Sequence, residues 1–312
     1  MQIGGIRISD MRINDSGANR PPQKNEAGTV RLHWLGQAGF LLETRGLRIL
    51  IDPYLSDSLA EKYAGKEFPH IRLMPAPIAP ESLFDIDYVF ASHCHTDHMD
   101  PKTLVPIQAN NPGCRFIVPK AGLAEAAARG LLPEMTLGMD AGQRLDLSPA
   151  GGITAPAGET VPPAGDTLPS VFVSCVLSAH EDLQFDPEGH SRYLGFVFDS
   201  GGFVLYHSGD CVPFPGLEES LTGRKIRLAL LPVNGRDEKR KSKGILGNFS
   251  LAEAVDLARR IGCEYFIGHH FGLFDFNTID REAGIALIES QYPGHSDSYL
   301  LAEMGIEYRF SV

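Results

Sequence analysis

The sequence is poor in the features that mark secreted, membrane-spanning and nucleic-acid-binding proteins. Its 312 residues include only five cysteines, an odd number without a CxxC pair, which indicates reduced thiols rather than a disulfide framework. No apolar run approaches the ~18 residues of a membrane span, and the polar N-terminal segment lacks the apolar core of a signal peptide. Basic residues are outnumbered 28 to 39, and the net charge of −11 disfavours a nucleic-acid binder. We therefore expect a cytoplasmic protein that binds neither membranes nor nucleic acid.

The remaining composition and patterning predict a single globular domain after an N-terminal arm. Residues 1–28 are polar and indicate an arm, which could exchange between the subunits of a homo-oligomer, and residues 29–312 form the domain. Helices are expected at 102–108, at 121–132 and at 251–261, the last with a capping box. Residues 149–169 are dense in Pro, Gly and Ala and predict a loop. Short strand-like runs occupy residues 30–35, 40–43, 47–52, 86–91, 116–118, 172–177, 194–198, 203–207, 228–233 and 265–267. The pattern alone indicates an α/β or α+β protein.

A dense group of potential metal ligands lies at residues 93–98, which read His-Cys-His-Thr-Asp-His. Imidazole and carboxylate are common ligands of zinc and similar divalent ions. His93 and His95 are two residues apart and project the same way in extended backbone, while Asp97 and His98 follow on a turn. The group leaves the carboxyl end of the apolar run 86–91, where open α/β sheets bind their ligands. This context favours a metal site over a solvated, histidine-rich turn.

The H-x-H-x-D-H run resembles the signature of the metallo-β-lactamase superfamily. Three further candidates of the expected type, His180, Asp210 and His270, each follow a strand-like run. The resemblance implies an α+β fold, a four-layer αββα sandwich, and two divalent metal ions, zinc or manganese. It implies that one ion is bound by His93, His95 and His180, that the second is bound by Asp97, His98 and His270, and that Asp210 bridges them. A water shared by the ions would become the attacking hydroxide, which Asp97 would orient before it carries the proton onward.

Five shorter segments are similar to the branch of this superfamily that contains L-ascorbate-6-phosphate lactonase. They are residues 34–40, 51–53, 179–181, 206–210 and 234–237. The resemblance implies a lactonase whose partner is a small anionic substrate, a phosphorylated sugar lactone. A phosphodiesterase of the same superfamily is one alternative, and a non-catalytic ligand-binding relative is another. All seven ligand positions are filled, which disfavours the non-catalytic alternative.

Several neighbours of these ligands could support the site. Asp52 ends a buried strand and could hold a ligand histidine or cap a turn, and the two interpretations have equal weight. His207 is expected to be a packed strand residue, whereas His269 could contact a ligand or the substrate. The basic run 236–243 is either a solvated surface or a phosphate clamp led by Arg236, and the segment ending at Asn248 would let it move. His190, the alternative to His180, is expected to be a solvated turn residue, and Cys211 a small buried thiol.

Overall fold

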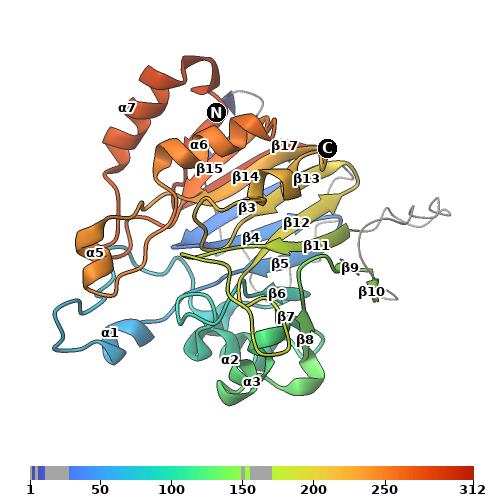
Figure 1. Cartoon of the computed structure of the whole chain (residues 1–312). Coiled ribbons are helices and arrows are strands. Elements are labelled where there is room, and N and C mark those ends of the chain that lie inside the picture. Colours follow the sequence, from blue (N-terminus) through green and yellow to red (C-terminus); the bar gives the residue numbers. More distant parts are fainter. Residues whose placement is uncertain (1, 4–5, 11–27, 149–151, 155–170) are drawn as a thin grey trace.

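Two β-sheets packed face to face form the centre of the molecule (Figure 1). The computed structural model describes residues 2–3, 6–10, 28–148, 152–154 and 171–312. The first sheet has the order β1 (Gln2–Ile3), β2 (Ile6–Asp10), β17 (Ile306–Ser311), β3 (Thr29–Gly36), β4 (Gly39–Thr44), β5 (Leu47–Ile51), β6 (Tyr88–Phe90), β7 (Arg115–Pro119), β8 (Thr136–Met139). The second has the order β10 (Ile153–Thr154), β9 (Arg144–Asp146), β11 (Val171–Leu177), β12 (Leu194–Ser200), β13 (Phe203–His207), β14 (Ile226–Pro232), β15 (Tyr265–His269), β16 (Tyr299–Leu301).

Helices cover the outer faces of both sheets, which completes four layers (Figure 1). The described helices are α1 (Ser58–Lys62), α2 (Pro101–Asn110), α3 (Leu123–Ala128), α4 (Leu217–Leu221), α5 (Glu238–Ser242), α6 (Leu251–Arg260) and α7 (Arg281–Gln291). Helix α3 contacts β7 and β8 of the first sheet, while α6 contacts β14 and β15 of the second. The expected α+β sandwich is therefore confirmed.

The main hydrophobic core lies between the two sheets. Phe90 of β6 contacts Phe196 and Phe198 of β12, with ring centroids 5.1 Å apart in both pairs. All three side chains are buried, and edge-on aromatic packing of this kind adds to the stabilisation from burial alone. A second cluster fills the space between the first sheet and α2, where Leu104 and Ile107 are buried. The strand β6 is thus packed on both faces, which fixes the loop that follows it.

The predicted helices and strands are found, and several differ from the prediction in their bounds. Helix α6 has the predicted capping box, in which Ser250 and Glu253 each bond the other's backbone N–H. The helix expected over 121–132 is shorter, because Gly130 adopts a left-handed conformation (φ +95°). The N–H of Leu131 then bonds the carbonyl of Ala126 at 3.1 Å, a closure that ends a helix. Strand β6 covers only the centre of the run 86–91.

Some predictions fall largely outside the described residues. Of the loop expected at 149–169, only residues 152–154 are described, and two of them form β10. Within the expected arm at 1–28, β2 pairs with β17 as a strand of the first sheet, and the arm's exchange between subunits stays a prediction. In the part of the chain that the structure describes, no helix is long and apolar enough to cross a bilayer.

A charged cluster lies on the first sheet, away from the sheet-to-sheet core. The Glu43 carboxylate is 3.2 Å from Nη2 of Arg31, 3.1 Å from Nε of Arg48 and 3.6 Å from Nε2 of His33. Burial alone would raise the pKa of Glu43, but its bond to His33 and the two arginines outweigh burial and lower the pKa to about 2. The folded protein therefore favours the ionised form of Glu43.

Candidate metal centre

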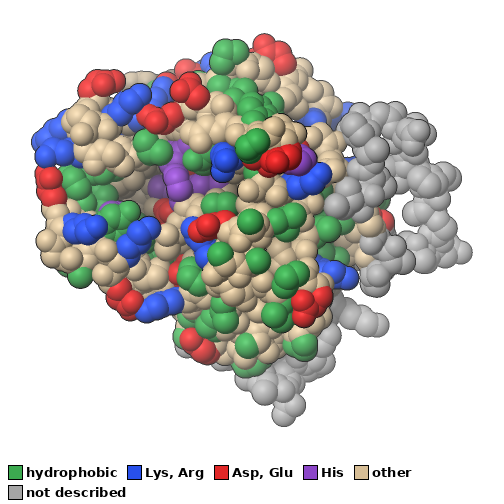
Figure 2. All heavy atoms as spheres, turned by 60° about the horizontal axis from the view of Figure 1, so that its bottom comes forward, with side chains coloured by type: hydrophobic (Ala, Val, Ile, Leu, Met, Phe, Trp, Pro, Cys, Tyr) green, Lys and Arg blue, Asp and Glu red, His purple; other side chains and the backbone are tan. Residues whose placement is uncertain are grey.

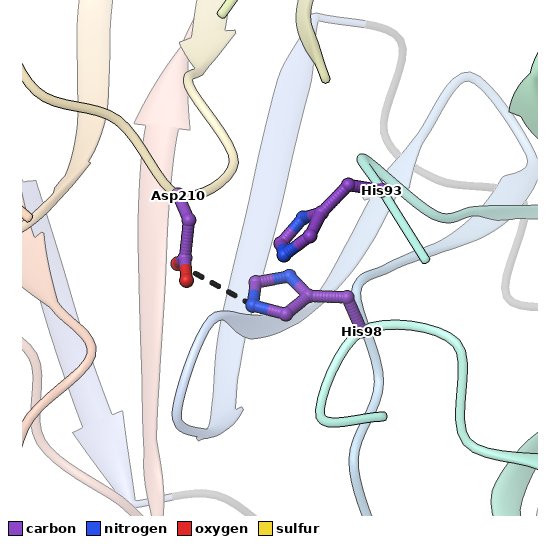
Figure 3. Close-up of side chains that lie close together, drawn as sticks. All are labelled: His93, His98 and Asp210. Carbon is purple, nitrogen blue, oxygen red and sulfur yellow. Dashed lines mark ion pairs between the residues drawn. The ribbon is translucent and has the colours of Figure 1, made fainter. Parts of the chain in front are cut away.

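Seven histidine and aspartate side chains converge at one edge of the two sheets. They form three overlapping groups, and within each group the potential ligand atoms lie within 4.8 Å of one another. The groups are His93, His98 and Asp210; His95, His180 and Asp210; and Asp97, His98 and His270. Figure 3 shows the first group, in which two imidazoles and a carboxylate point toward one another. The structure thus brings together all seven residues that the sequence singles out as ligands.

The topology explains why these residues meet. Strands β5 to β8 run parallel in the first sheet, and β13 to β16 run parallel in the second. The carboxyl ends of parallel strands gather at one edge of a sheet, where ligands bind. Residues 92–98 follow β6, and Asp210 and His270 follow β13 and β15. His180 follows β11 of the second sheet.

The local sequence fixes the two turns that pack against each other at the cluster, one before α2 and one at Gly209. After the histidine run, Asp100 caps α2 by accepting a bond from the N–H of Lys102 at 3.2 Å. On the opposite side, Gly209 precedes Asp210 with a φ of +63°. A Cβ at Gly209 would lie 2.6 Å from the Cβ of Ser92, so only glycine lets the two turns pack.

Asp52 holds His98 from behind the cluster. Its Oδ2 is 2.8 Å from Nδ1 of His98, and both side chains are fully buried. Ser92 donates to the same carboxylate through its N–H at 2.7 Å and its Oγ at 2.6 Å. Of the two roles that the sequence leaves open, the structure places Asp52 in contact with a predicted ligand. A carboxylate only accepts hydrogen bonds, so Nδ1 of His98 carries a proton and Nε2 presents a lone pair to the cluster.

The arrangement of lone pairs fits a divalent cation. Nε2 of His98 lies 3.3 Å from Oδ1 of Asp210, so in the neutral form of His98 two electron-rich atoms face each other in a buried site. Nε2 of His93 and Nε2 of His98 have no hydrogen-bond partner among the described residues, and Oδ1 of Asp210 faces Nε2 of His98 and Nε2 of His270 at 3.3 and 3.0 Å. Buried polar atoms without partners are costly, and a bound ion would satisfy all three. Imidazole and carboxylate donors suit zinc or manganese.

The protein alone perturbs the protonation of the cluster strongly. Burial would lower the pKa of His98, but the carboxylates of Asp210, Asp52 and Asp97 outweigh burial and raise it well above its usual value. Burial would raise the pKa of Asp210, but the neighbouring histidines, His270 first, hold it well below its usual value. Without an ion, a proton on His98 offsets the concentrated negative charge. A divalent ion would replace this proton.

Gln37 and Tyr193 were missed by the sequence analysis as individual contacts of the cluster, as was Ser92. Gln37 is buried, and its Nε2 donates to Oδ2 of Asp97 at 2.9 Å and lies 3.2 Å from Nε2 of His270. Tyr193 packs against the ring of His93, with centroids 5.0 Å apart. Gln37 lies within the segment 34–40 that carries the family resemblance, which is the one sequence signal that pointed to it.

Two predicted supporting histidines lie behind the cluster rather than in it. His207 and His269 are buried and stack on each other with centroids 5.0 Å apart. Nε2 of His207 donates to the carbonyl of Ala38 at 3.0 Å, in agreement with a packed strand residue. His269 is fully buried and does not line the cavity over the cluster, so the structure gives it no contact with a substrate. His190 bonds Asp186 in a turn.

The structure places Arg236 and Asn248 beside the cavity over the cluster rather than in its lining. The guanidinium of Arg236 donates to both carboxylate oxygens of Glu253, at 2.6 and 2.8 Å, and to the carbonyl of Asn248 at 3.1 Å. Asn248 is buried and donates from Nδ2 to Oδ1 of Asn234 at 3.0 Å. Neither residue lines the cavity over the cluster. Glu253 at the start of α6 binds the guanidinium of Arg236, which lines an adjoining cavity together with His180. Lys243, from the same basic run, lines this cavity instead.

A cavity of about 510 Å³ opens directly above the cluster. Figure 2 shows histidine side chains within a hollow that Lys and Arg side chains border. His95, Asp97, His180, Asp210 and His270 line it, together with the cations Lys62, Lys66, Arg129 and Lys243 and the rings of Tyr63, Phe68, His70, Phe274 and Phe276. The cavity is therefore positively charged on its sides and partly aromatic, which suits an anionic organic molecule.

Comparison with known proteins places these features in a family context. Residues 47–271 match the model of the beta-lactamase superfamily domain. A metal-dependent hydrolase from Methanosarcina mazei is 26% identical over 263 residues, which cover 84% of this chain and 92% of the relative. A metal-dependent hydrolase from Opitutus terrae is 31% identical over 206 residues, 65% of this chain and 72% of the relative. An N-acyl-phosphatidylethanolamine-hydrolyzing phospholipase D 1 from Caenorhabditis elegans is 23% identical, covering 87% of this chain and 73% of the relative.

Solved structures share the fold at low sequence identity. An isothiocyanate hydrolase from Delia radicum gut bacteria superposes with a TM-score of 0.64 at 15% identity, covering 90% of this chain and 100% of the other. A metallo hydrolase from the archaeon Ignicoccus hospitalis superposes with a TM-score of 0.59 at 18% identity, covering 91% and 99% of the two chains. These likenesses concern the arrangement of sheets and helices.

Proposed function

Since the chain belongs to the metallo-β-lactamase superfamily and is a metal-dependent hydrolase, we propose that it cleaves small anionic esters, with a phosphorylated sugar lactone as the first candidate. The observation that supports this most directly is the convergence of potential ligand atoms of His93, His98 and Asp210 beneath a cationic cavity. The proposed ligands are the seven residues of the cluster, with two ions of zinc or manganese. We propose that Asp210 is shared, since its Oδ1 faces Nε2 of His98 and His270 while its Oδ2 faces Nε2 of His180.

The bound ions would supply Lewis acidity, which lowers the pKa of water and polarises a substrate oxygen. The chain's own residues would orient the reaction. Asp97 is partly open to the cavity, and the Gln37 amide binds its Oδ2. We assign its other oxygen, Oδ1, the role of accepting the proton of the attacking water and passing it toward the leaving oxygen. Burial would raise the pKa of Asp97, but His98 and His270 lower it, so the carboxylate is ionised and able to accept.

The proposed substrate class follows from the charges around the cavity. Lys62, Lys66 and Lys243 line its sides, and ammonium groups there would attract a phosphate or carboxylate. Lys243 is 2.9 Å from Glu67 across the cavity, and an anionic substrate would compete with this exposed ion pair. We therefore propose that the anionic group lies toward Lys243 and that the ester carbonyl lies over the cluster.

A second candidate is a phosphodiesterase that uses the same cluster. It is supported by the similarity to the Caenorhabditis elegans protein named as a phospholipase D. The cationic walls suit a phosphodiester as well as a phosphorylated lactone. The two candidates differ in the attacked atom, carbon or phosphorus, and can be separated by assay.

The test is an activity panel with metal-reconstituted protein. L-ascorbate 6-phosphate, γ-butyrolactone and bis(4-nitrophenyl) phosphate are supplied with zinc or with manganese, and a chelator serves as the blank. We expect metal-dependent opening of the lactones, fastest for the phosphorylated one. The Asp97→Asn variant should fold normally and lose at least roughly 100-fold in turnover. Turnover of the phosphodiester alone would favour the second candidate, and equal rates in Asp97→Asn would refute the role of Asp97.

A further inference from the structure

One wall of the cavity is an aromatic cluster built around His70. The imidazole stacks on Tyr63, with centroids 4.2 Å apart and planes 22° apart. The rings of Phe274 and Phe276 meet it edge-on at 5.0 and 4.7 Å. Phe274 is itself buried in a hydrophobic cluster with Tyr54. The His70 ring is therefore held on two sides by side chains that pack into the body of the protein.

The backbone at His70 adopts a conformation that the surrounding contacts impose. Its φ of +52° lies in the left-handed region, which is uncommon for residues other than glycine. The following residues are tied to the rest of the fold, since the N–H of Leu73 bonds the carbonyl of Leu273 at 2.9 Å. Arg72 donates from Nη1 to the carbonyls of Tyr54 and Ser56 at 3.2 and 3.3 Å. Residues held in such conformations by many contacts are concentrated at binding sites.

Hydrogen bonding fixes which ring nitrogen of His70 can accept. Nδ1 lies 2.6 Å from the carbonyl oxygen of Phe68. A carbonyl only accepts, so Nδ1 carries the proton and Nε2 carries the lone pair. Burial lowers the pKa of His70, against smaller raising effects of the Phe68 carbonyl and Asp97. The ring is therefore neutral near pH 7, and Nε2 is a hydrogen-bond acceptor.

Two other acceptors of the cavity wall are already bonded. Both carboxylate oxygens of Glu67 accept from Nζ of Lys243, at 2.9 and 3.2 Å. Oδ1 of Asn277 accepts from Nδ2 of Asn234 and from Nη1 of Arg240, at 2.8 and 2.9 Å. The lysines of the wall only donate. A substrate hydroxyl that must donate a bond to this wall would thus find Nε2 of His70 ready to accept it.

We propose that Nε2 of His70 is a substrate-binding atom that accepts a hydrogen bond from a hydroxyl on the uncleaved part of the substrate. The cavity thereby selects polyhydroxylated, sugar-like lactones over unsubstituted ones. This inference rests on the proposed lactone hydrolysis and names the residue that reads the sugar. The lysines would hold the anionic group, while the aromatic rings would pack on the carbon skeleton.

The test compares a hydroxylated lactone with a plain one. The ratio of kcat/KM for L-gulono-1,4-lactone to that for γ-butyrolactone is measured with the zinc-loaded wild type and with His70→Phe, which keeps the stacked ring and removes the acceptor. We expect the ratio to fall roughly 5- to 10-fold, as for loss of one neutral hydrogen bond. His295→Phe is the matched control: His295 also stacks on a tyrosine, Tyr299, with centroids 4.4 Å apart, but it does not line the cavity, so its ratio should match the wild type. An unchanged ratio in folded His70→Phe overturns the proposal.

A second variant and a binding measurement cover the two cases in which the kinetic comparison gives no result. If His70→Phe does not fold, His70→Asn is used, because asparagine tolerates left-handed backbone and is too short to reach the position of Nε2. This variant should also lower the ratio of kcat/KM for L-gulono-1,4-lactone to that for γ-butyrolactone. If the wild type opens neither lactone, the proposed lactonase function fails. The role of His70 is then tested by calorimetric binding of L-gulonate and 4-hydroxybutyrate. Loss of a preference for gulonate in the variant supports the inference, and absence of any wild-type preference overturns it.

Discussion

The contact between Asp52 and His98 predicts that an isosteric change behind the cluster weakens metal binding. Asp52→Asn keeps the size of the side chain, and asparagine tolerates the left-handed backbone of residue 52 (φ +45°). One amide atom can still accept from the N–H of Ser92. The other becomes an NH₂ group that faces Nδ1 of His98, where the carboxylate accepts at 2.8 Å. His98 must then move its proton to Nε2, the atom that faces Asp210.

The loss of metal affinity expected in Asp52→Asn can be estimated in two ways, and the two estimates agree. A hydrogen bond to a charged group contributes about 1.5–3 kcal/mol, and both partners here are fully buried. Loss of a carboxylate that orients a ligand histidine costs about 10- to 100-fold in metal affinity, which corresponds to about 1.4–2.8 kcal/mol. We therefore expect Asp52→Asn to bind zinc and manganese about 10- to 100-fold more weakly, with activity restored in part by excess metal.

The assay is competition for zinc between the protein and a chromophoric chelator, together with ¹⁵N NMR of the zinc-loaded protein to identify which ring nitrogen of His98 carries the proton. Asp100→Asn is the matched control. Asp100 is also a fully buried aspartate, but its carboxylate bonds the hydroxyls of Ser56 and Thr103, both at 2.6 Å. It should lower the free energy of unfolding by about 1–3 kcal/mol without a comparable loss of metal affinity. Wild-type zinc affinity in folded Asp52→Asn would refute the reasoning.

Three further predictions concern the substrate preference set by Lys243, the loss of stability at low pH and the stabilisation of the protein by zinc. Lys243→Gln should raise KM for L-ascorbate 6-phosphate several-fold more than for γ-butyrolactone. Arg236→Gln should leave the preference for the phosphorylated lactone unchanged and lower the free energy of unfolding by about 1 kcal/mol. Equal losses of this preference in both variants would contradict the structure. The pKa of Glu43 is lowered from 4.5 to about 2 in the folded state, which corresponds to about 3 kcal/mol of the free energy of unfolding. This contribution is present above pH ~4.5 and is lost as the pH falls toward ~2. Urea unfolding is measured from about pH 5 to about pH 3 for the wild type and for Glu43→Gln. The difference between their free energies of unfolding should shrink as the pH falls, and a constant difference would refute the lowered pKa of Glu43. Zinc at roughly 1,000 times its Kd should stabilise the metal-free protein by about 4 kcal/mol, and an unchanged Tm would contradict a folded-state metal site.

The parts of the site that sequence predicted are those whose signal is local or repeated. The run 93–98 holds its spacing within six residues, and the apolar strand before it fixes where the run leaves the sheet. His180, Asp210 and His270 were found because each follows a strand-like run and matches a family pattern. The contact of Asp52 with His98 was left open, because it depends on the pairing of β5 with β6, which no local pattern specifies.

Residues whose role depends on contacts with distant parts of the chain were not predictable. His70 lies in an irregular segment, and its tautomer is fixed by the carbonyl of Phe68 and its ring by Phe274 and Phe276 far along the chain. Gln37 likewise reaches Asp97 across 60 positions. Neither contact leaves a periodic or compositional trace. The sequence therefore revealed the candidate ligands of the site and left its shape undetermined.

The basic run 236–243 illustrates why charge in a sequence does not identify the binding residue. Arg236 and Lys243 flank α5, and both could face an anion if only their side chains were considered. Glu253 decides between them, because the residue that completes the capping box of α6 also binds the guanidinium of Arg236. The capping box and the basic run are each visible in the sequence, but their meeting requires the bridge between Asn234 and Ser250. Anion selectivity should therefore follow Lys243, whose partner Glu67 is exposed and can be displaced by substrate.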